Sequence, residues 1–242
     1  MDNCLPDGAA TILSAKYLAR RDSDTVGILA CRVQGRTNLE ALACLFRPTV
    51  PPVRYPSLVL KEAVKALRAC SEKPVALHLG KTWDLTLLAS FVSTMNELNV
   101  DYQVVCFSFY PAAMGLSLDH LKSLKTLGER GGKDVAIAEY AYPCGAPSGQ
   151  FWFMNKPSKG YPLTLKDQAL WVKSFLRRCL ELGFLGAFYW SPELYLSKES
   201  AKRVKTPPEM PLGFGWGPMS LFDEDGCARP AASCLKHGLL DT

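Results

Sequence analysis

Glu139 lies where an apolar, strand-like run ends, in the segment "KDVAIAEYAYP" (133–143). A carboxylate at the end of a buried strand costs free energy unless it is paired, solvated or used in chemistry. Taken alone, this position fits an ion pair and a catalytic carboxylate equally well. Tyr110 and Trp190 end two further strand-like runs, so we expect a phenol and an indole to flank Glu139. This arrangement suits a sugar ring stacked on the indole, with a nucleophile beneath it.

A sugar-cleaving site of the retaining kind needs a second acid. Its two carboxyl groups stand about 5 to 5.5 Å apart, and one attacks the anomeric carbon while the other protonates the leaving oxygen. The second carboxyl group is therefore expected at the end of another strand.

Helical and strand-like patterns alternate from about residue 57 onward. Helix-period apolar residues lead into "PVALHL" (74–79), and three more such patterns lead into "YQVVCFSFYP", "KDVAIAEYAYP" and "GFLGAFYWSP". Continuous apolar strands between amphipathic helices predict a parallel sheet covered on its faces, either doubly wound or a (β/α)₈ barrel. The strands end in polar or aromatic residues, which favours the barrel, because its active site lies at those ends.

The segment "TVGILACRVQ" (25–34) is a fifth strand candidate, whereas a closed barrel has eight strands. We therefore expect residues 1–242 to form a single (β/α)₈ TIM-barrel domain that is incomplete at its N-terminus, with strands 4 or 5 to 8 present. Between 148 and 162, an aromatic loop without periodicity has the length of a functional loop.

Composition excludes several classes of partner. The formal charge of +5 is spread without a basic block, which argues against nucleic acid. No apolar run approaches the roughly 18 to 20 residues of a membrane span. The three histidines have no ligand spacing to one another, so we expect no metal site and no cofactor.

The nine cysteines include no C-x-x-C pair. Most of them, at positions 31, 70, 106 and 179, lie in apolar segments where a thiol packs as a small hydrophobic group. Reduced thiols are therefore favoured over a disulfide framework, and Cys144 with Cys227 or Cys234 is the alternative pairing to check.

Six segments in order carry a resemblance: "PVALHLGKTWD", "VVCFSFYP", "DVAIAEYAYP", "YPLTLKDQ", "LGAFYWSPE" and "MSLFDEDGCARPAASCL". Together they resemble the second half of the family 53 glycoside hydrolases, the arabinogalactan endo-β-1,4-galactanases. The likeness covers about residues 57–238 and leaves 1–56 as a divergent N-terminal segment. It implies a clan A (β/α)₈ barrel and retaining hydrolysis of β-1,4-galactan or arabinogalactan.

The resemblance also implies roles for individual residues. Glu139 matches the family's nucleophile, Tyr110 the tyrosine that hydrogen-bonds it, and Trp190 the indole beneath the sugar. His78, Trp83 and Asp84 match a motif that lines the substrate cleft. For His78, a hydrogen-bonded histidine of the core is an equally favoured alternative.

Glu40 matches the family's acid/base in "TNLEALACLFRP" (37–48), where Pro48 keeps the family spacing. Leu39 replaces an asparagine that would hydrogen-bond the sugar's 2-hydroxyl group, a contact that strengthens in the transition state. The other interpretation makes Glu40 a solvent-facing helix residue, with Asn38 as the N-cap.

Two hypotheses follow for the function. The first is an endo-β-1,4-galactanase-like hydrolase with Glu139 as nucleophile and Glu40 as acid/base; the alternative is an inactive or non-catalytic carbohydrate-binding relative or fragment. The resemblance implies an extracellular protein. No signal peptide is apparent in "MDNCLPDGAATILSAK", so the chain as written would stay in the cytoplasm.

Overall fold

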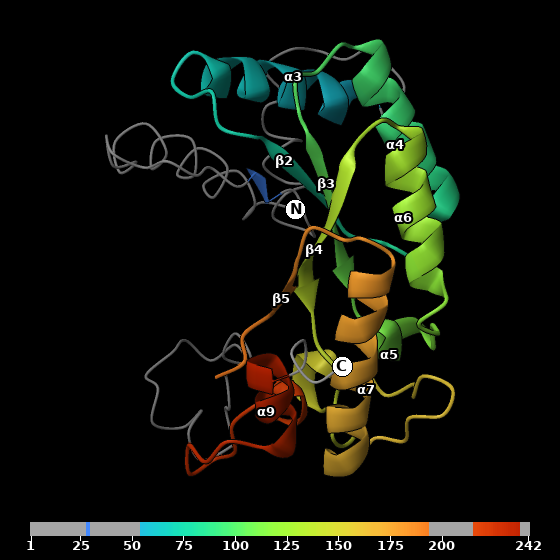
Figure 1. The fold of residues 1–242 in the computed structure, drawn as a ribbon, viewed down its shortest axis with the longest axis vertical. Helices are drawn as coiled ribbons and strands as arrows, with labels where there is room; N and C mark the ends of the chain where they lie inside the picture. The colour runs from blue at the N-terminus through green and yellow to red at the C-terminus, as the bar shows by residue number, and fades with distance from the viewer. Residues whose placement is uncertain (1–27, 30–53, 194–214, 238–242) are drawn as a thin grey trace, which may run out of the picture. The chain divides into compact units, whose positions relative to one another are not determined.

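Strands and helices alternate along the computed structural model, which describes residues 28–29, 54–193 and 215–237 (Figure 1). The strands are β1 (Ile28–Leu29), β2 (Ala76–Leu79), β3 (Val104–Phe109), β4 (Asp134–Tyr140) and β5 (Ala187–Tyr189). The helices are α3 (Arg54–Arg68), α4 (Leu85–Glu97), α5 (Pro111–Met114), α6 (His120–Arg130), α7 (Leu165–Glu181) and α9 (Pro230–His237). Two short 3₁₀ helices, η1 (Gly149–Phe151) and η2 (Gly217–Met219), lie in the loops.

The strands form one sheet in the order β1-β2-β3-β4-β5. The pairs β1–β2, β2–β3 and β4–β5 are parallel, with Leu77 opposite Val105 and Ile137 opposite Ala187. Sequential parallel strands joined by helices are the pattern of a βαβ barrel or open sheet. Each of the five predicted strand segments contains one of these strands, so the α/β prediction is confirmed.

The chain divides into two compact units, one of Met1–Ser108 with Thr126–Ala136 and one of Phe109–Lys125 with Ile137–Thr242. We call them unit 1 and unit 2.

Unit 1 packs helix α4 through Leu88, Val92 and Met95, which are all buried. The helix begins at Asp84, whose carboxylate accepts a hydrogen bond from the backbone N–H of Leu87 at 2.9 Å. Such an N-cap typically stabilises a helix by about 1 kcal/mol. Gly128 of α6 lets the helix backbone lie close to Val135 of β4, since a Cβ at residue 128 would lie 2.3 Å from Val135 Cγ2.

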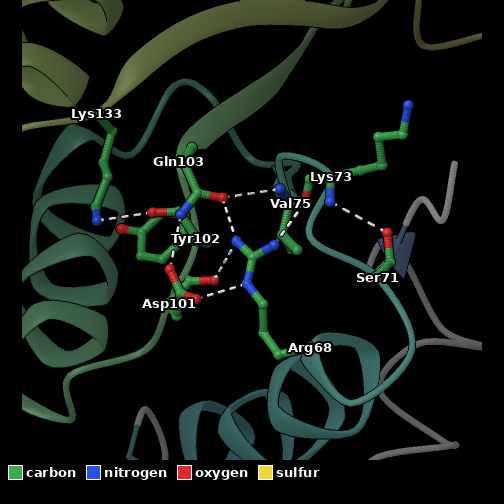
Figure 2. A network of polar contacts seen from close by, with 8 residues as sticks. All are labelled: Arg68, Ser71, Lys73, Val75, Asp101, Tyr102, Gln103 and Lys133. Atoms are coloured by element: carbon green, nitrogen blue, oxygen red, sulfur yellow. Dashed lines mark hydrogen bonds and ion pairs between the residues drawn. The ribbon is translucent and has the colours of Figure 1, made fainter. Parts of the chain in front are cut away.

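Arg68 closes the turn after α3 (Figure 2). Its Nε donates to Asp101 Oδ2 at 2.6 Å and its Nη1 to the carbonyl of Lys73 at 2.5 Å, while Nη2 donates to Gln103 Oε1. The amide oxygen of Gln103 also accepts from Val75 N at 3.0 Å. This Arg68 network (Arg68, Lys73, Val75, Asp101 and Gln103) therefore joins the residues that precede β2 to those that precede β3.

The pKa of Asp101 lies below its ordinary value, mainly because its carboxylate accepts the hydrogen bond from Arg68 and secondarily one from Gln103. Hydrogen bonds to the ionised form favour that form.

Aromatic rings fill the core of unit 2. Trp171 of α7 stacks on Tyr142 at a centroid distance of 4.6 Å and on Phe175 at 5.0 Å, and Tyr140 lies 4.3 Å from Phe175. Helix α7 begins at Thr164, whose hydroxyl accepts from the N–H of Asp167. Figure 1 shows α9 beside α7, and the two helices are in contact.

Gln168 on the buried face of α7 is a polar exception. Its amide nitrogen donates to the carbonyl oxygens of Tyr142 and Pro218, at 2.8 and 3.2 Å. The amide nitrogen thus satisfies two backbone acceptors within the core.

The six cysteines within the described ranges are free thiols, and the pairing of Cys144 with Cys227 or Cys234 is not formed. Cys106 and Cys179 are buried, as predicted, and burial raises the pKa of their thiols to about 11 and about 12. The prediction for Cys70 is wrong: it is exposed, because it lies just beyond the end of α3. Cys31 lies outside the described residues.

Candidate active site

Glu139 and Tyr110 meet at the carboxyl ends of β4 and β3. Glu139 is the penultimate residue of β4, and Tyr110 directly follows β3 as the N-cap of α5, with Pro111 beginning that helix. The Tyr110 hydroxyl donates a hydrogen bond to Glu139 Oε2 at 2.9 Å. The hydrogen bond expected from the sequence is therefore present, and it fixes the orientation of a partly buried carboxyl group.

Trp190 follows β5, the neighbour of β4. Its backbone N–H donates to the carbonyl of Tyr140 at 3.0 Å, which continues the sheet by one residue. The next residue, Ser191, has a φ of 46°, a left-handed conformation that is uncommon outside glycine. Such backbone conformations concentrate at functional sites, and this one turns the chain sharply after the indole.

Trp216 lies at the centre of the rings in this part of unit 2. It is 1% exposed, and its ring centroid lies 4.4 Å from that of Trp190 and 6.1 Å from that of Tyr110, edge to face in both cases. Phe151 packs on it at 4.9 Å. The indole Nε1 donates to the carbonyl of Ser191 at 3.0 Å. These contacts define an aromatic cluster around the carboxylate, the Glu139 cluster, which consists of Tyr110, Glu139, Phe151, Trp190 and Trp216.

Gly215 sets the position of Trp216. Its φ is +86°, and a Cβ at this residue would lie 1.9 Å from the carbonyl oxygen of Ser148. Only glycine fits both the backbone conformation and the close approach.

Arg229 holds the turn that follows Trp216. Its guanidinium donates to the carbonyl oxygens of Gly217 and Ser220 at 2.8 and 2.9 Å. A backbone bond from Cys144 N to Pro218 O, at 2.8 Å, joins this turn to the segment that follows β4. Contacts from Arg229 and Cys144, which are far apart in the sequence, thus fix the turn that follows Trp216.

The second group of predicted residues lies in unit 1. His78 of β2 shares a 2.8 Å hydrogen bond between its Nε2 and Ser108 Oγ, and the Thr82 hydroxyl donates to the Ser108 carbonyl at 2.8 Å. All three side chains are buried. Trp83 is 48% exposed, and Asp84 caps α4. The indole of Trp83 can therefore meet a ligand, and the structure gives Asp84 a role in starting the helix.

Glu40 lies outside the described residues, as do Leu39 and Asn38. Its proposed acid/base role stays a prediction, and so do the catalytic role of Glu139 and the cleft-lining roles of His78, Trp83 and Asp84. Across the described ranges, no group of three or more His, Cys, Asp or Glu residues is placed to bind a metal ion. No helix there is long and apolar enough to cross a membrane.

The sequence analysis missed Trp216, Phe151 and Ser108. Trp216 stands in the glycine-rich segment "GFGWGP" (213–218), where a large aromatic residue in a loop without periodicity was the available signal. Ser108 gave no signal, because a serine within an apolar strand is common and its pairing with His78 is made only by strand register.

The sequence model of glycosyl hydrolase family 53 matches residues 48–235. A curated relative, the "Uncharacterized protein in bgaB 5'region" of Niallia circulans, is 31% identical over an alignment of 198 residues that covers 77% of this chain and 51% of the relative. The endo-beta-1,4-galactanase of Bacillus subtilis (strain 168) is 30% identical over 124 residues, 49% of this chain and 29% of that enzyme. The chain thus spans about half the length of the first relative, and less of the second.

Solved structures of similar fold include the GH53 catalytic domain of Ignisphaera aggregans, with a TM-score of 0.61 at 21% identity, covering 82% of this chain and 53% of that one. A fungal beta-1,4-galactanase matches with a TM-score of 0.58 at 18% identity, covering 77% and 55%. At these identities the likeness establishes the fold. The predicted TIM-barrel type is confirmed, and the chain corresponds to part of such a barrel.

Proposed function

The chain belongs to glycosyl hydrolase family 53, and on that premise we propose that it hydrolyses β-1,4-galactosidic bonds of galactan or arabinogalactan with retention of configuration. The galactanase names of the curated relatives support this substrate. Because the chain spans only part of those relatives, the activity is proposed for the site that its residues build.

One observation carries the proposal: the 2.9 Å hydrogen bond from Tyr110 to Glu139 Oε2, made beside the rings of Trp190 and Trp216. The hydrogen bond from the phenol fixes the orientation of the carboxylate that would attack the anomeric carbon. Trp190, half-buried at the end of the neighbouring strand, gives the sugar an apolar face to stack on.

The mechanism is a double displacement. Glu139 attacks the anomeric carbon and forms a galactosyl-enzyme while an acid protonates the leaving sugar oxygen. The same group then acts as a base and activates water, which releases the sugar chain from Glu139 with its original anomeric configuration. We assign the acid/base role to Glu40.

A second function, carbohydrate binding without hydrolysis, is favoured by one sequence feature. Leu39 stands where the family pattern has an asparagine, and leucine cannot hydrogen-bond the sugar's 2-hydroxyl group. In this alternative the aromatic side chains bind the sugar, but no bond is cleaved.

The test measures the release of reducing ends from β-1,4-galactan by the parent chain and by Glu139→Gln. The substitution keeps the size of the side chain and removes the nucleophile, so we expect turnover to fall by about 10³-fold or more. Glu224→Gln, on an exposed carboxylate of the same unit, is the matched control and should keep parental activity.

Glu40 is tested by Glu40→Ala on an aryl β-galactoside whose leaving group needs no proton; added azide attacks the galactosyl-enzyme directly and so replaces the water that the missing base would activate. Rescue of activity by azide supports the assignment, whereas an active parent without rescue moves the acid/base role to another residue. A parent chain that binds galactan but releases no reducing ends would support the binding function and contradict the hydrolase.

A further inference from the structure

Trp152 is a large apolar side chain left in solvent by a segment that buries Phe151 and Met154. It is 66% exposed, whereas Phe151 is 5% and Met154 1% exposed. Single exposed apolar residues are ordinary, but an indole is the largest of them and is often placed at a surface to meet a ligand or partner.

The backbone around Trp152 is held in place by hydrogen bonds. The segment begins with η1, and Met154 N donates to the carbonyl of Phe151 at 2.9 Å. Further along the chain, Lys156 N donates to the carbonyl of Ala112 at 2.9 Å. The Ser158 hydroxyl donates to the backbone carbonyl of Leu116 at 2.7 Å.

The Tyr142 hydroxyl holds the far end of the same loop. It accepts from Ser158 N at 2.9 Å and donates to the carbonyl of Tyr161 at 2.5 Å. An indole carried on a turn that is bonded on both sides loses little conformational entropy when a ligand stacks on it.

Trp152 is joined to the Glu139 cluster through its neighbour. The ring of Phe151 packs on Trp216, which in turn packs on Trp190 and Tyr110. The turn that presents Trp152 is therefore anchored on the same buried indole that positions the rings beside Glu139.

We propose that Trp152 is a stacking platform for an outer galactose unit, separated from the unit that Glu139 would attack by at least one other. The inference rests on the proposed function and deepens it, since it assigns a residue to a sugar unit that a disaccharide bound at Glu139 does not reach. The flat apolar face of an indole fits the C–H face of a pyranose ring, and neutral stacking of this kind tolerates the hydroxyl groups at the ring's edge.

The experiment uses the full chain carrying Glu139→Gln, which prevents turnover, and measures binding of β-1,4-linked galactobiose and galactohexaose by calorimetry. Adding Trp152→Ala should weaken galactohexaose binding about tenfold, or about 1.4 kcal/mol, and leave galactobiose binding unchanged. Trp152→Phe keeps a ring and should recover part of the affinity.

Leu180→Ala is the matched control, since Leu180 is an apolar side chain of α7 with 58% exposure. It should alter neither affinity. The melting temperature should be the same in all these variants, because neither side chain is buried.

Two results would overturn the platform while leaving the proposed function standing: unchanged binding of galactohexaose in Trp152→Ala, or equal weakening of both ligands. If the Glu139→Gln chain binds neither oligosaccharide, the proposed function fails, and the platform fails with it.

Discussion

The Glu139 cluster of unit 2 and the Arg68 network of unit 1 hold charged groups in opposite ways. Arg68 directs its guanidinium at one carboxylate, one amide and two backbone carbonyls, and Asp101 remains 61% exposed. Glu139 is partly buried, accepts from a phenol and lies beside aromatic rings. Multiple polar partners in solvent suit a structural link, whereas a carboxylate next to apolar rings suits a group that acts on a ligand.

Among the substitutions that test this comparison, Trp216→Ala should have the largest effect on stability. Removing a fully buried indole should lower the free energy of unfolding by about 3–5 kcal/mol and disorder the rings beside Glu139. Urea denaturation measures the loss. Trp152→Ala removes the same side chain from an exposed position and should leave the stability close to parental; equal losses in both variants would contradict the assigned packing.

Tyr110→Phe removes the hydroxyl that donates to Glu139. We expect kcat to fall about tenfold, because the carboxyl group loses the contact that orients it, and we expect the melting temperature to change little. Steady-state hydrolysis of galactan measures kcat, and thermal melting measures the stability of the variant.

The control for that variant is Tyr161→Phe, since Tyr161 contributes its backbone carbonyl to the contact with Tyr142. Unaltered kcat in Tyr110→Phe would show that the phenol does not serve the reaction, and the distinction between the two regions would weaken.

Arg68→Ala should act in the opposite sense, on stability and not on chemistry. The loss of its hydrogen bonds should cost about 1 kcal/mol and lower the melting temperature by about 2–4 °C, a modest effect because Asp101 is largely exposed. Lys65→Ala, at the 77% exposed lysine of α3, is the control. A fall in kcat without a fall in melting temperature would contradict a purely structural network.

The smallest effect concerns pH. The folded-state pKa of Asp101 is lowered, so its contribution to stability is present above its unfolded pKa of about 4 and is lost as the pH falls through the lower folded value. Asp101→Asn should therefore be less stable than the parent at pH 7, and the gap should narrow by pH 3. Unfolding titrations at both pH values test this, with Glu72→Gln as the exposed carboxylate control.

Much of the fold was readable from the sequence, because apolar runs and helical spacing reflect burial directly. The segments before β2, β3, β4 and β5 were predicted as helices, and α3, α4, α6 and α7 are found there. On α7, Cys179 is buried as expected. Trp171, Phe175 and Gln168 share its buried face, since aromatic stacking and two carbonyl acceptors draw them inward.

The candidate site likewise contains residues that the sequence predicted and others that it did not. Residue types at strand ends located Glu139, Tyr110 and Trp190, because neighbouring parallel strands bring their carboxyl ends together. Trp216 could not be found in this way: it reaches the cluster through a loop whose position depends on Gly215 passing the carbonyl of Ser148.

By itself, the sequence determined the alternation of strands and helices, the family and the carboxylate at the end of β4, since burial periodicity and local motifs are properties of neighbouring residues. Only the tertiary structure decided that Trp216 packs on Trp190 and that Trp152 stays in solvent while Phe151 and Met154 are buried. These outcomes depend on long-range packing and hydrogen bonding between segments far apart in the chain, which no local pattern encodes.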